Sequence, residues 1–197
     1  PANVTLAESF REAGWQTAAA VSVPHLTPAR SGLGQGFDRV WLGQGDSAND
    51  GAKTIDAVRD WWRSFAREGS RPTFLWLHLF DAHTPYEVPA WFLADYAERL
   101  GVAVPERSAA PATLPETQFA GPGGFLADVT NVAWPEFQYR AAVAYQDELL
   151  RRLFTEWNAE FGSDHAFVAV IADHGEALGE HGNWYHHAGL YREVMHV

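Results

Sequence analysis

The sequence predicts an α/β fold in which a mostly parallel sheet is flanked by helices. Two runs, residues 73–80 and 166–172, are apolar on both faces, as expected of central strands that are covered on both sides. Segments with helical spacing alternate with strand-like segments along the chain, which is typical of a parallel sheet. With 197 residues, of which 47% are hydrophobic and 14% aromatic, the chain can bury a sizeable core.

The first elements are indicated by local signals. Thr5 and Glu8 have the spacing of a capping box, and Gly14 is a suitable C-terminal stop, so residues 5–13 are predicted to be a helix. Residues 15–23, which are rich in alanine and valine, are predicted to be a strand.

The next segment contains glycines at positions 32, 34 and 36. They do not indicate a phosphate-binding loop, because no helix-forming segment follows them directly. Residues 52–68 place apolar side chains at helical spacing and predict a second helix, which ends at Gly69. The strand at 73–80 follows and leads into a turn at 81–86, Asp-Ala-His-Thr-Pro-Tyr.

The second half begins with an irregular stretch. Residues 101–135 contain five prolines and a Gly-Pro-Gly-Gly cluster, and they are interpreted as an irregular excursion that covers the substrate. Residues 136–154, extending as far as 161, predict a long amphipathic helix that Gly162 ends. The strand at 166–172 comes next.

Functional side chains are expected just beyond the carboxyl ends of the strands. Asp173 and His174 directly follow the strand at 166–172, and five of the nine histidines fall between residues 174 and 196. A carboxylate beside an imidazole on a glycine turn is a pattern of metal ligands. Taken without its surroundings, Asp173 is instead expected to cap the next helix.

The composition limits the partners. The chain has 14 basic and 25 acidic residues, a net charge of −11, which argues against a nucleic acid or an anionic membrane surface as the main partner. A bound cation would dominate its immediate surroundings, so a small anionic substrate remains compatible with this charge. The chain has no cysteine, and therefore no disulfide or thiolate metal ligand. Neither the compartment nor the oligomeric state is predicted.

Several stretches resemble the sulfatases of the alkaline-phosphatase-like superfamily. The most specific is residues 172–182, Ala-Asp-His-Gly-Glu-Ala-Leu-Gly-Glu-His-Gly, with a later Leu-Tyr at 190–191. The other matching stretches are residues 5–8 with 13–18, 34–38, 74–89 and 139–153. The resemblance implies that residues 1–197 are a partial sulfatase-like catalytic domain with an incomplete alkaline-phosphatase-like fold.

The resemblance also implies roles for individual residues. Asp173 and His174 are similar to two ligands of a divalent cation, Ca²⁺, Mg²⁺, Mn²⁺ or Zn²⁺. His83 is similar to a catalytic histidine that contacts the anionic group or the leaving oxygen of the ester, although a histidine before Thr-Pro can also simply shape the turn. His186 is predicted to be catalytic, because the family places a lysine or histidine that touches the substrate anion there. His187 lies one position away, so a slip by one residue is open; otherwise it belongs to a solvated loop.

Two parts of the family pattern are missing from this chain. These are the aspartates that complete the metal site and the Cys-x-Pro-Ser-Arg type motif that supplies the nucleophile. We therefore expect an internal piece of a metal-dependent sulfuric ester hydrolase, inactive as the isolated chain. The alternatives are a phosphoryl enzyme on the same fold (a phosphodiesterase, phosphonate hydrolase or phosphoethanolamine transferase) and a non-catalytic binding module. A cysteine nucleophile would favour the sulfatase, and a threonine or serine would favour phosphoryl transfer.

Overall fold

The computed structural model describes residues 3–26, 28–43, 50–68, 71–115, 124–162 and 166–197. The chain divides into two compact units. The first unit contains residues 1–82 and 145–155, and the second contains residues 83–144 and 156–197.

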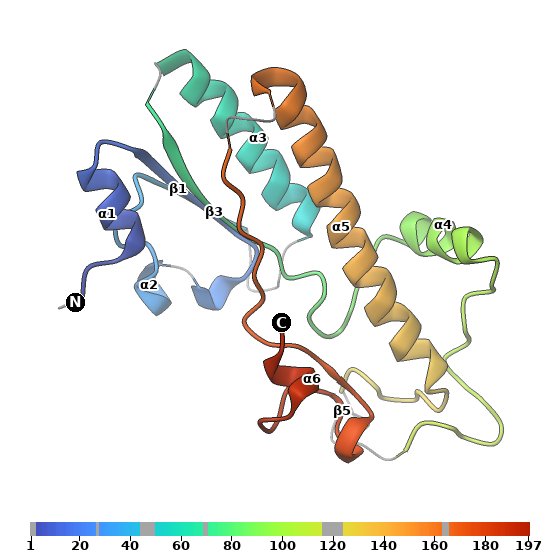
Figure 1. Ribbon diagram of the computed structural model, residues 1–197. Helices are drawn as coiled ribbons and strands as arrows, with labels where there is room; N and C mark the ends of the chain where they lie inside the picture. Colours follow the sequence, from blue (N-terminus) through green and yellow to red (C-terminus); the bar gives the residue numbers. More distant parts are fainter. Residues whose placement is uncertain (1–2, 27, 44–49, 69–70, 116–123, 163–165) are drawn as a thin grey trace. The chain divides into compact units, whose positions relative to one another are not determined.

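The first unit is built on a parallel sheet (Figure 1). Its strands are β1 (Gln16–Val21), β2 (Arg39–Leu42) and β3 (Thr73–His78), in the order β2-β1-β3. Both neighbours run parallel to β1, whose Ala18 is paired with Arg39 on one side and with Leu75 on the other. This arrangement confirms the predicted α/β class and the predicted strands at 15–23 and 73–80.

The helices of the first unit begin with α1 (Leu6–Glu12), where the predicted capping box is present. Thr5 Oγ1 accepts a hydrogen bond from the Glu8 backbone N–H at 3.1 Å, and the Thr5 backbone N–H donates to Glu8 Oε2 at 2.9 Å. A 3-10 turn (Pro24–Leu26) and α2 (Pro28–Ser31) follow β1. The predicted second helix is α3 (Gly51–Glu68), and Gly69 lies outside the described residues.

Successive side chains of a strand point to opposite faces of the sheet, and both faces of this sheet have packing partners. On one face, Ala19 and Val21 of β1 pack with Phe37 and Trp76. On the other face, the Ser22 and Thr54 hydroxyls, just after β1 and in α3, lie 2.6 Å apart in a buried hydrogen bond. Figure 1 shows α1 and α3 on opposite sides of the strands, as this alternation requires.

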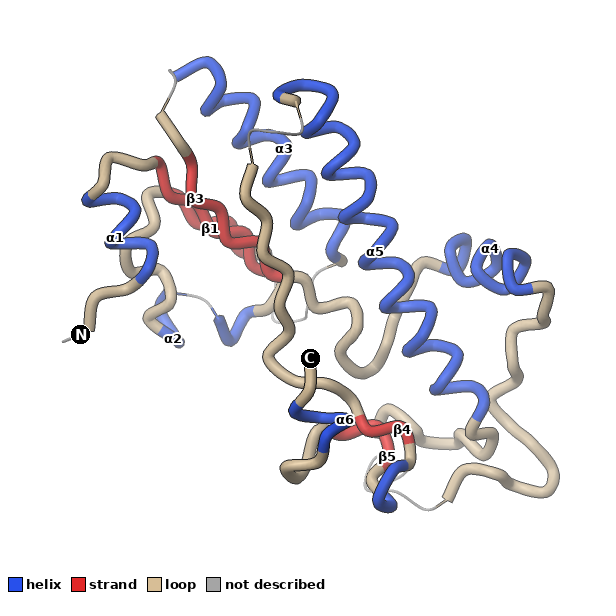
Figure 2. Tube along the Cα trace, viewed as in Figure 1, coloured by secondary structure: helices blue, strands red, loops and turns tan. Residues whose placement is uncertain are grey.

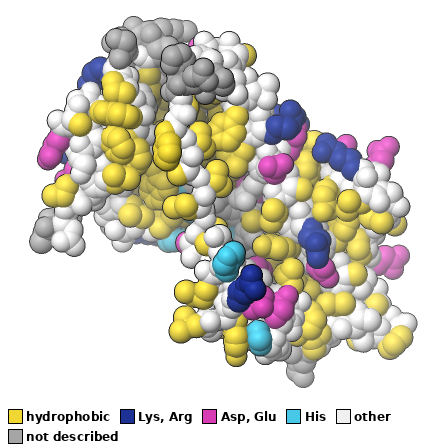
Figure 3. Space-filling view, viewed as in Figure 1, with side chains coloured by type: hydrophobic (Ala, Val, Ile, Leu, Met, Phe, Trp, Pro, Cys, Tyr) yellow, Lys and Arg dark blue, Asp and Glu magenta, His cyan; other side chains and the backbone are white. Residues whose placement is uncertain are grey.

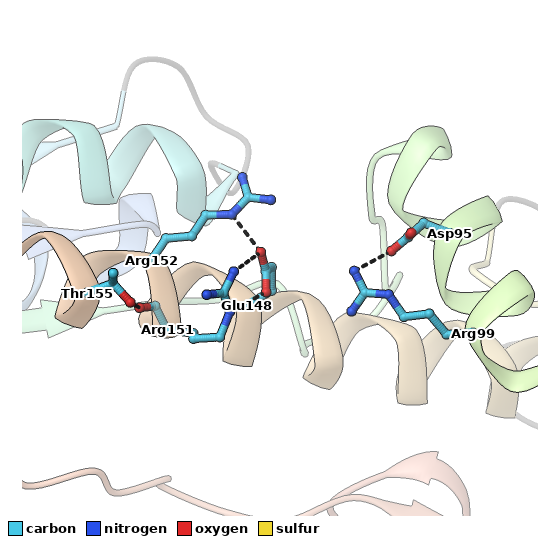
Figure 4. Close-up of polar contacts among 6 residues, drawn as sticks. All are labelled: Asp95, Arg99, Glu148, Arg151, Arg152 and Thr155. Carbon is cyan, nitrogen blue, oxygen red and sulfur yellow. Dashed lines mark hydrogen bonds and ion pairs between the residues drawn. The ribbon is translucent and has the colours of Figure 1, made fainter.

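Two further helices carry ion pairs on their surfaces (Figure 4). These helices are α4 (Ala90–Leu100) and α5 (Ala133–Phe161), which begins three residues before the predicted start at 136. In α5, Glu148 accepts hydrogen bonds from Arg151 and Arg152, which lower the pKa of its carboxyl to about 2. In the described part of the chain, no helix has the length and apolar character needed to cross a membrane.

The second unit has its own core. The buried side chains of Tyr86, Leu126, Ala142 and Tyr185 pack together, and Phe125, Trp134, Tyr139 and Trp184 surround them. The stretch 101–132 contains no helix or strand in its described part, and residues 116–123 lie outside that part. Backbone hydrogen bonds hold this stretch together, since the Thr130 carbonyl accepts from Leu114 at 3.1 Å and the Arg107 carbonyl accepts from the Thr130 N–H at 3.0 Å.

The C-terminal part of the second unit is compact (Figure 2). It contains a short antiparallel pair, β4 (Ala177–Leu178) and β5 (Trp184–His186), joined by a 3-10 turn at Glu180–Gly182. The last helix is α6 (Arg192–Met195).

The prediction of a strand at 166–172 is wrong for this structure. Figure 2 shows the segment as a loop, and no backbone hydrogen bond joins it to another described residue. Its apolar side chains are exposed, Phe167 by 97% and Ile171 by 91%. Figure 3 shows that hydrophobic side chains are exposed on this face of the molecule. A strand is defined by pairing as well as by sequence, and within the described residues this apolar run has no paired neighbour.

Candidate functional site

The four predicted site residues all belong to the second unit. His83 opens this unit, in the turn that follows β3. Its Nδ1 lies 2.7 Å from the carbonyl oxygen of Thr84. Because a carbonyl oxygen only accepts hydrogen bonds, Nδ1 of His83 is the protonated donor in this contact.

Asp173 and His174 lie side by side in the loop before β4. Nδ1 of His174 lies 2.8 Å from the Gly175 carbonyl oxygen, which can only accept, so Nδ1 is the donor in this contact. Nε2 of the same ring is 3.9 Å from Oδ1 of Asp173. The Asp173 side chain is 91% exposed. The same Oδ1 accepts the backbone N–H of His174 at 3.1 Å, and it faces the imidazole nitrogen across a short gap.

Three further imidazoles gather beside this pair. The His187 ring is stacked on the His174 ring, with centroids 4.0 Å apart. The same His187 ring lies 4.9 Å from His186 and 6.5 Å from His83. Desolvation, followed by repulsion from His174, His186 and His83, lowers the pKa of His187 below its ordinary value. The structure thus brings the three predicted histidines together around a fourth.

A carboxylate lies among these histidines. Glu176 Oε2 accepts a hydrogen bond of 2.9 Å from the hydroxyl of Tyr86, a fully buried residue. Glu176 Oε1 is buried and has no hydrogen-bond partner among the described residues. Burial raises the pKa of Glu176, against the lowering effects of the Tyr86 hydrogen bond and of the nearby His174 and His83. This hydrogen bond joins the turn after His83 to the loop that carries Asp173.

The glycine between His174 and Glu176 allows a close contact with α6. The Gly175 N–H donates to the Val194 carbonyl at 2.7 Å. A Cβ atom at position 175 would lie 2.1 Å from the Glu193 carbonyl oxygen, far inside van der Waals contact. Only glycine fits here, so the segment that positions His174 depends on the absence of a side chain at its neighbour.

Asp173 and His174 suit a divalent cation by the chemistry of their donor atoms, because carboxylate oxygen and neutral imidazole nitrogen are common ligands of such ions. In the described part of the chain, no group of three or more His, Asp or Glu side chains is arranged to hold a metal ion. The two residues are therefore at most part of a ligand set.

The sequence pattern of the Sulfatase family matches residues 2–197. The chain belongs to the sulfatase family. Among solved structures, it is similar to the C-terminal periplasmic domain of EptC from Escherichia coli in complex with Zn, with a TM-score of 0.50 and 14% sequence identity. The match covers 80% of this chain and 40% of that one, and it shows that this chain has an alkaline-phosphatase-like fold. No curated protein matches this chain in sequence.

Three residues of this arrangement were not predicted from the sequence as site members. Glu176 and Tyr86 were seen only as parts of the family pattern, and His187 was assigned to a solvated loop. A sequence signal for Glu176 as a site residue was its position directly after Asp-His-Gly. The next residue, Ala177, is buried in the structure. No local signal indicates that His187 stacks on His174, because that contact depends on the path of the chain between the two residues.

Proposed function

We propose that this sulfatase chain provides half of the site of a metal-dependent sulfuric ester hydrolase. The observation that carries the proposal is the orientation of the His174 ring. Its Nδ1 is engaged by the Gly175 carbonyl, and its Nε2 faces Asp173 Oδ1 at 3.9 Å. Asp173 and His174 would hold the cation, which when bound supplies a Lewis acid for an ester oxygen.

The histidines would act on the ester itself. His83 and His186 are proposed to contact the anionic group or to deliver a proton to the departing alkoxide. Their placement around His187 supports this role, because an anion bound beside several imidazoles favours their protonated forms. Glu176 would hold the His83 turn next to the Asp173 loop through its hydrogen bond with Tyr86.

The proposal predicts weak metal binding that depends on two residues. We expect calorimetric titration of the 197-residue chain with Zn²⁺ or Mn²⁺ to give a dissociation constant no tighter than micromolar, because two ligands leave the coordination incomplete. Asp173→Ala and His174→Ala should each remove the binding. His196→Ala, which changes an exposed histidine, is the matched control and should leave it unchanged. Submicromolar affinity, or binding that survives both site variants, would contradict the proposal.

The type of ester can be tested with inorganic anions. In the presence of Zn²⁺, sodium sulfate should shift the imidazole resonances of His83 and His186 at lower concentration than sodium phosphate does. A stronger response to phosphate would favour the phosphoryl alternative, and a response to neither would favour a binding module.

The nucleophile gives a second test. The chain contains no cysteine, so we expect no turnover of 4-nitrophenyl sulfate by the purified chain. Turnover that Asp173→Ala abolishes would refute this part of the reasoning.

A further inference from the structure

A pocket of the first unit lies at the amino ends of the parallel strands. It is lined by Gln16, Asp38, Arg39, Phe65 and Arg71, and it encloses about 200 Å³. Gln16 is the first residue of β1, Arg39 is the first residue of β2, and Arg71 lies shortly before β3. All five lining residues belong to the first unit, so the pocket shares no residue with the candidate functional site.

The side chain of Gln16 carries the inference, because it is a buried amide without a partner. The residue is 3% exposed, and neither Oε1 nor Nε2 has a hydrogen-bond partner among the described residues. Its backbone is held in place, since its N–H donates to the Pro72 carbonyl at 2.9 Å. Buried polar side chains in folded proteins are almost always hydrogen-bonded. A ligand that supplies one acceptor and one donor would satisfy both atoms of this amide.

The Gln16 amide points to the face of the sheet on which α3 lies. Ser22 continues the course of β1, because its N–H donates to the His78 carbonyl at 3.3 Å. Gln16 and Ser22 are an even number of positions apart, so their side chains leave the strand on the same side. The Ser22 hydroxyl lies 2.6 Å from that of Thr54 in α3, and Phe65 of the pocket belongs to the same helix.

Two arginines give the pocket positive charge. Arg39 is held in place, because its Nη1 donates to the Ser64 hydroxyl at 2.7 Å and its guanidinium lies 4.6 Å from the centre of the Phe65 ring. Arg71 is exposed, and in the part of the chain that the structure describes its guanidinium makes no hydrogen bond or ion pair. The planar guanidinium of Arg71 can therefore offer two parallel N–H donors to a carboxylate.

Asp38 places a carboxylate in the same pocket. Its Oδ2 accepts the Thr17 N–H at 3.1 Å, and its own N–H donates to the Thr17 hydroxyl at 2.9 Å. These two hydrogen bonds fix Asp38 against β1. Its Oδ1 makes no hydrogen bond to another described residue, so this oxygen can accept one from a ligand.

The charges and the volume of the pocket limit the ligand class. A simple carboxylate would leave Oε1 of Gln16 without a donor, and an amine alone would be repelled by the two guanidinium groups. A molecule that carries a carboxylate and an ammonium group on one carbon atom matches both signs of charge. Because the volume of about 200 Å³ is below the usual range of about 300–1,000 Å³ for ligand pockets, a single small molecule fits better than a peptide.

We infer that this pocket binds a free α-amino acid. The carboxylate of the ligand pairs with Arg71 and Arg39 and accepts from Nε2 of Gln16. The ammonium group donates to Asp38 and to Oε1 of Gln16, and Phe65 contacts the side chain of the ligand. The inference does not depend on the proposed ester hydrolysis, because no residue of the second unit takes part in it.

The experiment is a protein-observed NMR titration of the 197-residue chain. The probes are L-alanine, L-valine and L-leucine. Isovalerate is the analogue of valine without the ammonium group, and isobutylamine is the analogue without the carboxylate. We expect at least one of the three amino acids to shift the side-chain NH₂ resonances of Gln16 at millimolar concentration. Each analogue should bind at least about tenfold more weakly than valine, because it lacks one charged contact.

Three variants test the contacts one by one. Gln16→Leu and Arg71→Leu should each weaken amino-acid binding by about tenfold. Gln16→Leu should also leave the Tm of the ligand-free chain equal or higher, since it removes a buried amide that has no partner; this result separates lost binding from unfolding. Asp38→Asn keeps an acceptor for the Thr17 N–H and should weaken valine binding without weakening isovalerate binding.

Two controls separate the possible failures. Arg63→Leu changes an exposed arginine of α3 that does not line the pocket, and it should leave amino-acid binding unchanged. Asp173→Ala should remove metal binding and leave amino-acid binding intact, so the two proposals fail independently. Binding of either analogue as tight as that of valine, no binding of the three amino acids, or binding that survives both Gln16→Leu and Arg71→Leu would overturn the inference.

Discussion

Replacement of Tyr86 by phenylalanine tests how the loops of the candidate site are held together. The Tyr86 ring is fully buried, so Tyr86→Phe keeps the packing and removes only the hydroxyl that donates to Glu176 Oε2 at 2.9 Å. Since Oε1 of Glu176 already has no partner among the described residues, the variant leaves the buried carboxylate without a hydrogen-bond donor from that part of the chain. Hydrogen bonds to charged groups contribute about 1.5–3 kcal/mol, and we expect a loss of free energy of unfolding in this range at pH 7.

Urea denaturation followed by tryptophan fluorescence measures this loss, and thermal unfolding gives an independent value. For a chain of this size, a change of about 1.5–3 kcal/mol corresponds to a decrease in Tm of about 3–12 °C. Tyr96→Phe is the matched control. It removes a hydroxyl of the same unit that makes no hydrogen bond to another described residue, and it should change stability by less than about 0.5 kcal/mol. Equal stability of Tyr86→Phe and the wild-type chain would show that Glu176 is solvated and that the Tyr86–Glu176 hydrogen bond does not contribute to the free energy of unfolding.

Three further predictions concern other parts of the chain. Asp81 is 8% exposed and accepts the Gly51 N–H at 3.0 Å. Burial raises the pKa of its carboxyl in the folded state. The contribution of Asp81 to the free energy of unfolding is therefore full below the ordinary carboxyl pKa and is lost as pH rises through the folded-state pKa. Asp81→Asn keeps the acceptor, so the variant should match the wild type in Tm at pH 3 and exceed it at pH 7, and a lower Tm at pH 7 would refute this assignment. Gly175→Ala forces a Cβ against the Glu193 carbonyl and should cost about 1–3 kcal/mol in urea denaturation, whereas an unchanged midpoint would show that α6 moves away freely. Ile171→Lys charges an exposed apolar segment and should reduce aggregation measured by light scattering without a change in Tm; unchanged aggregation would show that this segment is not the adhesive surface.

Elements with local signals were predictable from the sequence. The capping box at Thr5 and Glu8 appears atom for atom, because its two hydrogen bonds join residues three positions apart. The short strand β2 and the helix α4 were not predicted. Strand β2 has four residues, and its existence depends on pairing of Arg39 with Ala18, which lies 21 positions earlier in the chain. The segment 166–172 shows the opposite error, since its apolar composition indicated a strand that the structure leaves unpaired.

The candidate site was predictable where its residues are neighbours in the chain. The proximity of Asp173 and His174 follows from their adjacency. The positions of His186 and His187 depend instead on backbone conformations that composition does not reveal. Tyr185, directly before them, is buried and adopts a left-handed φ of 53°, while its hydroxyl donates to the Val132 carbonyl at 3.1 Å. This anchored and strained residue sets the direction of the two histidines that follow, and a strained conformation of this kind is maintained only by tertiary contacts.

The two carboxylates of the Asp-His-Gly-Glu sequence differ in their surroundings. Asp173 is 91% exposed and is open to a ligand from solvent. Glu176 is partly buried, its pKa is raised by that burial, and its Oε2 is committed to Tyr86. A cation that took Glu176 as a ligand would have to reach its buried Oε1, because Oε2 accepts the hydrogen bond of the Tyr86 hydroxyl.

Exchange of these two residues, Asp173→Glu with Glu176→Asp, should therefore abolish metal binding although the number of carboxylates is unchanged. The shorter side chain at position 176 cannot reach the Tyr86 hydroxyl, and the longer carboxylate at position 173 no longer faces Nε2 of His174. Calorimetric titration with Zn²⁺ measures the outcome. Wild-type affinity in the exchanged variant would show that the site responds to total charge and not to this geometry.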